Sequence, residues 1–324
     1  MKRRRLLGGA AWALLASHGA AHAADAYPSK PVVVIAPSGP GGGYDFVGRL
    51  IGQALTTQMK QSFVVENRAG SGTLVGTQAA ANAAPDGCTL LIGGLSNMVF
   101  NAALYPALPY DAQRDFVPVA LVARYPYVLA ARGDLPQSTA KDLIAAARAQ
   151  PGQFTIATVG SGSGQQVLAA AFARAAQVKL LAVPYRSAQA AYQDLLAGRV
   201  DLFFDTLPSL RPHLDSRRAR ALFITSAARN PVVPVVPTAA EAGLPMLEMG
   251  SWFGLFAPRK TPVAVVAALR TALASAMNEP QTLARLHGAG IEAMSLDPAQ
   301  TDAFIRAEFH KWTDVIRQAG ITAE

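Results

Sequence analysis

The chain has 324 residues, of which 51% are hydrophobic and 15% charged, with one cysteine and a formal net charge of +8. These values are typical of a folded globular protein with one or two domains. They exclude a disordered chain, a collagen-like repeat and a small protein stabilised by disulfides.

The first 23 residues have the order of parts that a secretory signal peptide requires. Basic residues at positions 2–5 precede an uncharged apolar run over 6–16, and Ala21-His22-Ala23 follows as a cleavage site. A transmembrane anchor would need about 20 apolar residues, more than this run contains. We therefore expect export to the periplasm with cleavage after Ala23, by either the general secretory or the twin-arginine route.

Short apolar runs alternate with Ala- and Leu-rich segments along the rest of the chain. This pattern predicts an α/β fold with largely parallel sheets, and about 300 residues are too many for one core, so we expect two lobes. The expected strands, each of ordinary length for a sheet, are 32–36, 63–66, 89–93, 154–158, 180–183, 200–204, 221–225 and 252–256.

Helix start signals separate several of these strands. Asp45 is the expected N-cap of the first helix, Ser138 marks another start, and Thr261-Pro262 a third with proline at the first helical position. A last helix is expected from about 298 to 318, with its aromatic residues packed in the core rather than forming a binding site. The Pro-rich segment 230–237 is interpreted as a surface connection.

Three glycine-rich turns, at 37–45, 66–76 and 158–164, each follow an expected strand and precede an expected helix. Glycine lets the backbone approach a ligand closely, and the free amides of a helix N-terminus carry partial positive charge. Such turns suit a carboxylate or a phosphate at the carboxyl ends of the strands. For the first and third turns the alternative is a plain turn that binds nothing.

Enzyme signatures are missing from these turns. None has the Lys-Ser/Thr pair that a P-loop needs after its last glycine, and the turn at 70–76 lacks the acidic partner of a dinucleotide site. Ser161 and Ser163 do not lie in a Gly-x-Ser-x-Gly motif, and no histidine is near to act as a base. A secreted or periplasmic hydrolase acting on a small anion is therefore the alternative hypothesis, not the favoured one.

Other residue types restrict the function further. Cys88 has no disulfide partner and is interpreted as a buried, inert thiol. The three histidines beyond the expected signal peptide, at 213, 287 and 310, are too far apart in the sequence for a metal site. No cofactor is expected. The basic cluster of Arg217, Arg218 and Arg220 contains no aromatic residue and is interpreted as a solvated turn, so we expect no nucleic-acid partner.

Nine short phrases occur in order along nearly the whole mature chain, each weak alone and specific together. They are Tyr27-Pro-Ser-Lys-Pro, Pro-Gly-Gly-Gly-x-Asp at 40–45, Val-Glu-Asn-Arg-Ala-Gly at 65–70, Ala84-Pro-Asp-Gly, Leu108-Pro-Tyr-Asp, Val183-Pro-Tyr, Val200-Asp-Leu-Phe-Phe-Asp205, Val236-Pro-Thr-x-x-Glu-Ala-Gly-Leu-Pro and Ser251-Trp-Phe-Gly. With these phrases the chain resembles the periplasmic solute-binding proteins of tripartite tricarboxylate transporters, known as Bug proteins.

This resemblance implies a two-lobed periplasmic-binding-protein fold of the Venus-flytrap, type II-like kind, with mixed sheets flanked by helices. Lobe one would combine residues 27–125 with 252–324, and lobe two would be 126–251. The resemblance also implies a non-catalytic monomer. It would capture a small organic carboxylate between the lobes, through backbone amides and bridging waters, and deliver it to membrane permease subunits.

By position, the resemblance implies ligand contacts from both lobes. The residues concerned are Ser38, Gly42, Gly43, Tyr44, Thr73 and Ser96 in lobe one, and Ser161, Gly162, Ser163, Gln165, Ala188 and Asp205 in lobe two.

Two of these positions leave alternatives open. Asp205 could instead be the N-cap of a helix beginning at Pro208; facing a ligand, its charge would repel a carboxylate and suit a hydroxyl, an amine or a fixed water. Tyr44 stands where many family members have a small residue, and it could narrow the pocket or stack on a ring. Ser38 and Ser187 also depart from the family pattern, so the kind of acid stays open.

Overall fold

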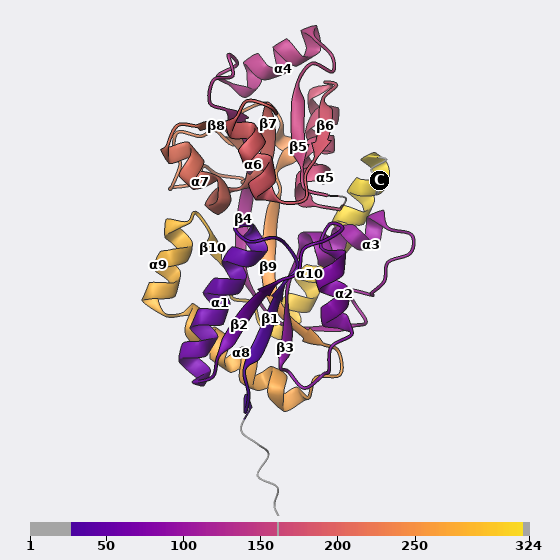
Figure 1. Ribbon diagram of the computed structural model, residues 1–324, viewed down its shortest axis with the longest axis vertical. Helices are drawn as coiled ribbons and strands as arrows, with labels where there is room; N and C mark the ends of the chain where they lie inside the picture. Colours follow the sequence, from indigo (N-terminus) through magenta and orange to yellow (C-terminus); the bar gives the residue numbers. More distant parts are fainter. Residues whose placement is uncertain (1–26, 161, 320–324) are drawn as a thin grey trace, which may run out of the picture.

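The computed structural model describes residues 27–160 and 162–319. The expected signal peptide over 1–23, its cleavage point after Ala23, and Ser161 lie outside the described residues. The described chain folds into two α/β lobes that lie end to end and are connected by two long strands (Figure 1). The two-lobed mixed α/β arrangement predicted from the sequence is therefore confirmed.

The first lobe is built on one mixed sheet. Its strands, in spatial order, are β2 (Phe63–Asn67), β1 (Val32–Ala36), β3 (Thr89–Gly94), β9 (Gly250–Pro258), β4 (Phe116–Arg132) and β10 (Glu292–Ala293). Strand β1 runs parallel to both of its neighbours, and Val34 lies between Val65 and Leu90. Because such a strand is covered on both faces, its sequence is a continuous apolar run.

Helices cover both faces of this sheet. One face carries α1 (Gly43–Met59), α8 (Val263–Met277) and α9 (Pro280–Gly288); the other carries α2 (Leu74–Ala81), a π-helical turn (Ser96–Phe100), α3 (Asn101–Leu104) and α10 (Pro298–Ala319).

The second lobe has its own sheet, which shares β4 with the first. Its other strands are β5 (Thr155–Thr158), β6 (Leu181–Pro184), β7 (Leu202–Thr206) and β8 (Ala219–Ile224), and β7 lies between β4 and β5. The helices around it are α4 (Ala140–Ala149), α5 (Gly164–Ala176), α6 (Ala188–Leu196), α7 (Leu207–Asp215) and the 3-10 turn Pro245–Leu247. The parallel trio β6-β5-β7 places the starts of α5 and α6 at the edge that faces lobe one (Figure 1).

Strand β4 belongs to both sheets and was not expected from the sequence. Up to Pro126 it pairs with β9, and from Tyr127 it pairs with β7. The register shifts just after Pro118, because proline has no backbone amide to donate to the neighbouring strand. Pro118 and Pro126 are also the reason that the sequence did not indicate a strand here. The lobe limits expected after 125 and before 252 fall within these long strands, and as exact limits they stay a prediction.

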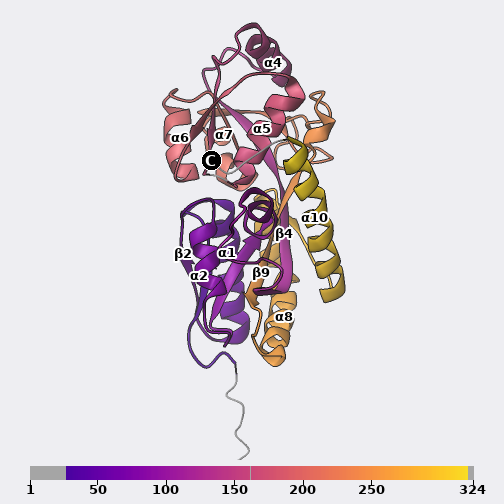
Figure 2. The same cartoon turned by 90° about the vertical axis from the view of Figure 1, so that its right-hand side faces the viewer.

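One apolar cluster runs through both lobes on the flank covered by α10. Helix α10 packs against β4 and α3 in lobe one and against α5 in lobe two (Figure 2). Trp312 and Ile316 of this helix are buried in the same cluster as Phe172 and Phe223 of lobe two. The expected last helix and its core role are thus confirmed.

Two expected helix starts are shifted. The N-cap of α4 is Thr139, whose Oγ1 accepts a hydrogen bond from the Asp142 amide at 3.1 Å, so Ser138 lies just outside. Pro262 is the N-cap of α8 rather than its first helical residue. In both cases the sequence signal is right and the position is wrong by one residue, the usual uncertainty of helix ends.

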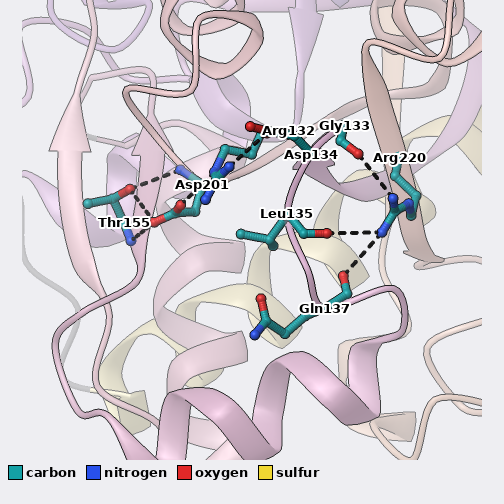
Figure 3. Close-up of polar contacts among 8 residues, drawn as sticks. All are labelled: Arg132, Gly133, Asp134, Leu135, Gln137, Thr155, Asp201 and Arg220. Carbon is teal, nitrogen blue, oxygen red and sulfur yellow. Dashed lines mark hydrogen bonds and ion pairs between the residues drawn. The ribbon is translucent and has the colours of Figure 1, made fainter.

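Arg220 corrects the interpretation of the basic cluster. The pair 217–218 is exposed, but the Arg220 guanidinium is half-buried and donates to the carbonyls of Gly133, Leu135 and Gln137 at 3.0 to 3.4 Å (Figure 3). A planar guanidinium with several donors suits this role. Arg220 therefore holds the segment between β4 and α4 instead of being solvated.

Two smaller expectations are wrong in degree. Cys88 is half-buried rather than buried, although burial still raises the pKa of its thiol and keeps it protonated. The Pro-rich segment is not only a surface connection, because Val233 and Val236 are buried in lobe two while Val235 is 84% exposed.

Candidate functional site

A cavity of about 460 Å³ lies between the lobes, where the glycine-rich turns face one another. Ten of the twelve predicted site residues line it: Ser38, Gly42, Gly43, Tyr44, Thr73, Ser96, Ser163, Gln165, Ala188 and Asp205. The residues come from opposite lobes and are up to 167 positions apart, so only the tertiary fold brings them together.

The other two predicted residues are Ser161 and Gly162. Ser161 lies outside the described residues. Gly162 is at the seam between the lobes, where its amide donates to the Gln166 side chain at 2.8 Å and a Cβ would clash with the Asn101 side chain. The backbone freedom of Gly162, whose φ is +77°, lets the chain pass this narrow point.

Four helices direct their N-termini toward the cavity. The first residues of α1, α5 and α6, or their N-caps, line it, and so does Thr73, the N-cap of α2. Each helix start offers unpaired amides and a partial positive charge. Helix starts that converge from both lobes make the cavity suitable for an anion.

The caps differ in how many amides they leave available. Ser163 and Ser187 each use a hydroxyl to accept one amide of their own helix, from Gln166 and Ala190. Gly42, the N-cap of α1, has no side chain for this purpose. Thr73, the N-cap of α2, likewise accepts no amide of its own helix. The starts of α1 and α2 therefore have more donor capacity left for a bound group than those of α5 and α6.

Asp45 is not the N-cap that the sequence suggested. It lies inside the first turn of α1, where its carboxylate accepts the Gly41 amide at 2.9 Å and forms an ion pair with Arg49 at 2.9 Å. Gly41 has a φ of +79°, so the turn depends on glycine there. Asp45 thus fixes the shape of the first glycine turn and does not line the cavity.

Aromatic rings form the floor behind this turn. The Tyr44 ring is 8% exposed and meets Phe253 edge-on at 4.8 Å, and Phe253 stacks on Tyr125 at 4.7 Å. The Tyr44 hydroxyl donates to Asn97 Oδ1 at 3.1 Å. Tyr44 therefore lines the pocket with its hydroxyl already bonded within lobe one.

Asp205 is the only acid among the described residues of the lining, and it is 1% exposed. Its Oδ1 accepts hydrogen bonds from Gln165 Nε2 at 3.1 Å and the Thr206 amide at 2.8 Å, and its Oδ2 accepts one from the Tyr192 hydroxyl at 2.9 Å. Burial raises the pKa of this carboxyl to about 6, against these three bonds, which lower it.

The alternative role for Asp205 is wrong. Helix α7 begins at Leu207 with Thr206 as its N-cap, and Asp205 is the last strand position but one. Asp205 lines the cavity from lobe two instead of capping a helix.

Arg186 was missed in the sequence. It is exposed at the cavity and is the only Lys or Arg in the described lining, with no ion-pair partner among residues 27–160 and 162–319. Tyr185, Ser187 and Gln189 also line the cavity. The sequence does contain one signal for this part of the site, because Ser187 is a typical helix N-cap and follows the expected strand 180–183. This is a fourth turn from a strand into a helix, but it has no repeated glycine.

A larger hollow of about 700 Å³ lies at the strands that connect the lobes. Its charged or titratable lining residues are exposed and of mixed sign: Arg124, Arg229, Glu248, His287 and Glu292. The C-terminal end of α9, which favours cations, also reaches it. This hollow lacks the converging helix starts of the cavity. The smaller cavity is therefore the candidate binding site.

Two features are absent from the described residues. No group of three or more His, Cys, Asp or Glu side chains there could hold a metal ion. None of the helices within 27–160 and 162–319 is both long and apolar enough to cross a membrane.

Residues 47–321 match the family described as "Tripartite tricarboxylate transporter family receptor". This chain belongs to that family. A "UPF0065 protein in tcbD-tcbE intergenic region" of Pseudomonas sp. (strain P51) is 38% identical over 99% of this chain and 96% of its own length. Protein BugT of Bordetella pertussis is 33% identical over 92% of this chain and 91% of its own length. The resemblance to Bug proteins is confirmed.

Solved structures agree with this assignment. "R. palustris Rpa4515 with adipate" has a TM-score of 0.88 and 33% identity, over 91% of this chain and 99% of that one. MatC of Rhodopseudomonas palustris, with bound malate, has a TM-score of 0.85 and 33% identity, over 90% of this chain and 100% of that one. The "periplasmic binding protein BugD" has a TM-score of 0.87 and 29% identity, over 92% of this chain and 100% of that one, which confirms the two-lobed periplasmic-binding-protein fold.

Proposed function

We propose that this receptor-family protein binds a small organic carboxylate in the cavity between its lobes and delivers it to the membrane permease of a tripartite tricarboxylate transporter. It acts in the periplasm as a monomer, after cleavage of the signal peptide, and performs no reaction on its ligand. The observation that carries this proposal is the convergence of the starts of α1, α2, α5 and α6 on one cavity.

Similar proteins support the chemistry of the ligand. Rpa4515 holds adipate and MatC holds malate, and both are dicarboxylates. The cavity of about 460 Å³ is of the size that small-molecule sites have. Amides at helix starts can neutralise a carboxylate without any reactive side chain.

Closure of the lobes would couple binding to delivery. On the cavity side, hydrogen bonds connect the lobes: Ser209 Oγ donates to the Gly41 carbonyl at 3.0 Å, and the Gly164 amide donates to Ser96 Oγ at 3.2 Å. A ligand that touches both lobes favours this closed arrangement over an open one, because only differential affinity shifts such an equilibrium. The permease would then distinguish the closed, loaded form.

Thermal unfolding with a panel of mono- and dicarboxylates tests the proposal. A true ligand at a hundredfold excess over its dissociation constant should add about 2.7 kcal/mol to the free energy of unfolding. Calorimetric titration then gives its affinity. Lack of stabilisation by every member of the panel contradicts carboxylate binding, and loss of the added compound over time favours a hydrolase.

A further inference from the structure

A buried acid inside an anion-binding cavity is electrostatically unfavourable. Asp205 is 1% exposed, lines the cavity, and forms no ion pair within the part of the chain that the structure describes. A carboxylate ligand would be repelled by it at short range. Such a residue weakens both folding and binding unless the ligand supplies something that it can bind.

Asp205 is held in one orientation. Three donors, from α5, α6 and the end of β7, bind its two oxygens, and two of these bonds are on Oδ1. Because an ionised carboxylate offers about four acceptor positions, one on Oδ2 stays available. The acceptor is thus fixed in direction, as a specificity contact requires.

Its position relative to the anion-binding amides is also defined. Gln165, which donates to Oδ1, is the second residue of α5, and Ser163 and Gln165 both line the cavity. The Asp205 carboxylate therefore lies beside the helix start that would hold the ligand's carboxylate. A ligand atom close to that carboxylate would meet Asp205.

We propose that Asp205 is a specificity-determining residue that accepts a hydrogen bond from a hydroxyl or ammonium group carried by the ligand next to its carboxylate. This inference rests on the proposed function and narrows its substrate class to hydroxy- or amino-carboxylates. Asp205 selects against an unsubstituted acid, since that ligand brings a charge close to Asp205 and no donor. An ammonium neutralises the buried charge, and a hydroxyl satisfies the remaining acceptor position.

A matched ligand series tests this inference by calorimetric titration at pH 8. The two series are succinate, malate and aspartate, and glutarate, 2-hydroxyglutarate and glutamate. The wild-type protein should bind a substituted diacid of one series at least tenfold more tightly than the unsubstituted one. Comparison of the hydroxy and amino members identifies which donor the site accepts.

Asp205→Asn should change the affinities for the unsubstituted acid and for the amino acid in opposite directions. Removing the charge should tighten binding of the unsubstituted acid by several-fold and weaken binding of the amino acid, which loses its counter-charge. Asp201→Asn is the matched control, since Asp201 is near the far end of β7 and bonded to Arg132 and Thr155 (Figure 3). It should leave the order of affinities unchanged.

Equal wild-type affinity for substituted and unsubstituted diacids overturns the inference, and so does a preference that persists unchanged in Asp205→Asn. The wild-type series needs no variant, so poor folding of Asp205→Asn does not remove the test. If no diacid of either series binds the wild-type protein, this inference fails, whereas the proposed function fails only if no mono- or dicarboxylate of the thermal-unfolding panel stabilises the protein.

Discussion

The two lobes meet in two regions of opposite character. Around the cavity the contacts are polar and few, such as the hydrogen bond from Ser209 to the Gly41 carbonyl. On the flank covered by α10, by contrast, Trp312 and Ile316 pack in an apolar cluster with Phe172 of lobe two. Water can replace polar contacts at small net free energy, whereas separating apolar side chains costs about 25 cal/mol per Å² exposed.

This difference indicates which side of the molecule opens. The apolar flank and the continuous strand β4 keep the lobes attached, while the glycine turns on the cavity side can separate. A hinge motion about the attached side is the expected form of closure for this fold. The four predictions below test the comparison, beginning with the attached side.

Trp312→Ala should have the largest effect. The side chain is 6% exposed and meets Phe100 edge-on at 5.5 Å, so its loss should lower the free energy of unfolding by about 3–5 kcal/mol. Denaturant unfolding measures this. Arg306→Ala, an exposed position of the same helix, should change it by less than about 0.5 kcal/mol. Equal effects of the two variants would show that the α10 flank contributes little.

On the cavity side, the buried carboxylate of Asp205 should lower the stability of the folded protein at neutral pH, whereas Trp312 raises it. Burial raises the pKa of its carboxyl to about 6 from 3.8, so the folded protein binds a proton more tightly than the unfolded chain. Between these values stability falls as the pH rises, since the folded state then holds more protons. Relative to Asp205→Asn, the wild-type protein should therefore lose about 2 kcal/mol between pH 4 and pH 8.

Urea unfolding of both proteins across this pH range gives the difference directly. The groups that face Asp205 are Tyr125 and Tyr127 on β4 and Tyr192 on α6, whose pKa values burial raises away from this window. The His213 ring of α7 contacts the Tyr192 ring at a tilt of 40°, with 4.4 Å between the ring centres, and burial lowers the pKa of His213. His213→Asn is therefore the control, and a pH dependence that follows His213 would contradict the assignment to Asp205.

Gly42→Val should abolish ligand binding, by about 100-fold or more, without unfolding the protein. Its φ of −84° suits any residue, and a Cβ there would make only ordinary contacts with Ser38 and the Gly39 carbonyl. The added methyl groups would fill cavity space at the start of α1. Gly43→Val is the contrast, because its Cβ would clash with the buried Tyr125 hydroxyl and lower stability. Thermal unfolding and titration separate the two effects, and full affinity of Gly42→Val would exclude this turn from the site.

The sequence predicted the local elements better than their connections. Strand β1 was predicted with its observed limits, because a covered parallel strand is an unbroken apolar run between polar turns. The glycine turns were recognisable because they need positive φ or close approach. Strand β4 was not predicted, because Pro118 and Pro126 argue against a strand in the sequence. The strand is stabilised by its pairing with β9 and β7, which the sequence does not show.

The site residues also fall into those that a local sequence pattern predicts and those that only the tertiary structure shows. Positions tied to a turn motif, such as Gly42 and Ser163, could be predicted, while Arg186 has no local signature. The environment of Asp205 could not be predicted either, since its partners Gln165 and Tyr192 are 40 and 13 residues away along the chain. Burial and hydrogen bonding of a single acid are properties of the tertiary structure.

The smallest effect is expected at the seam itself. Ser209→Ala removes the hydrogen bond to the Gly41 carbonyl and should weaken the closed form by about 1 kcal/mol, which lowers ligand affinity about fivefold. Ser216→Ala, near the end of α7, is the matched control, since its hydroxyl bonds only within that helix, to Pro212 and His213. Titration of both variants measures the difference. If Ser209→Ala binds as tightly as the control, the polar contacts of the cavity side do not contribute to closure, and the ligand alone holds the lobes together there.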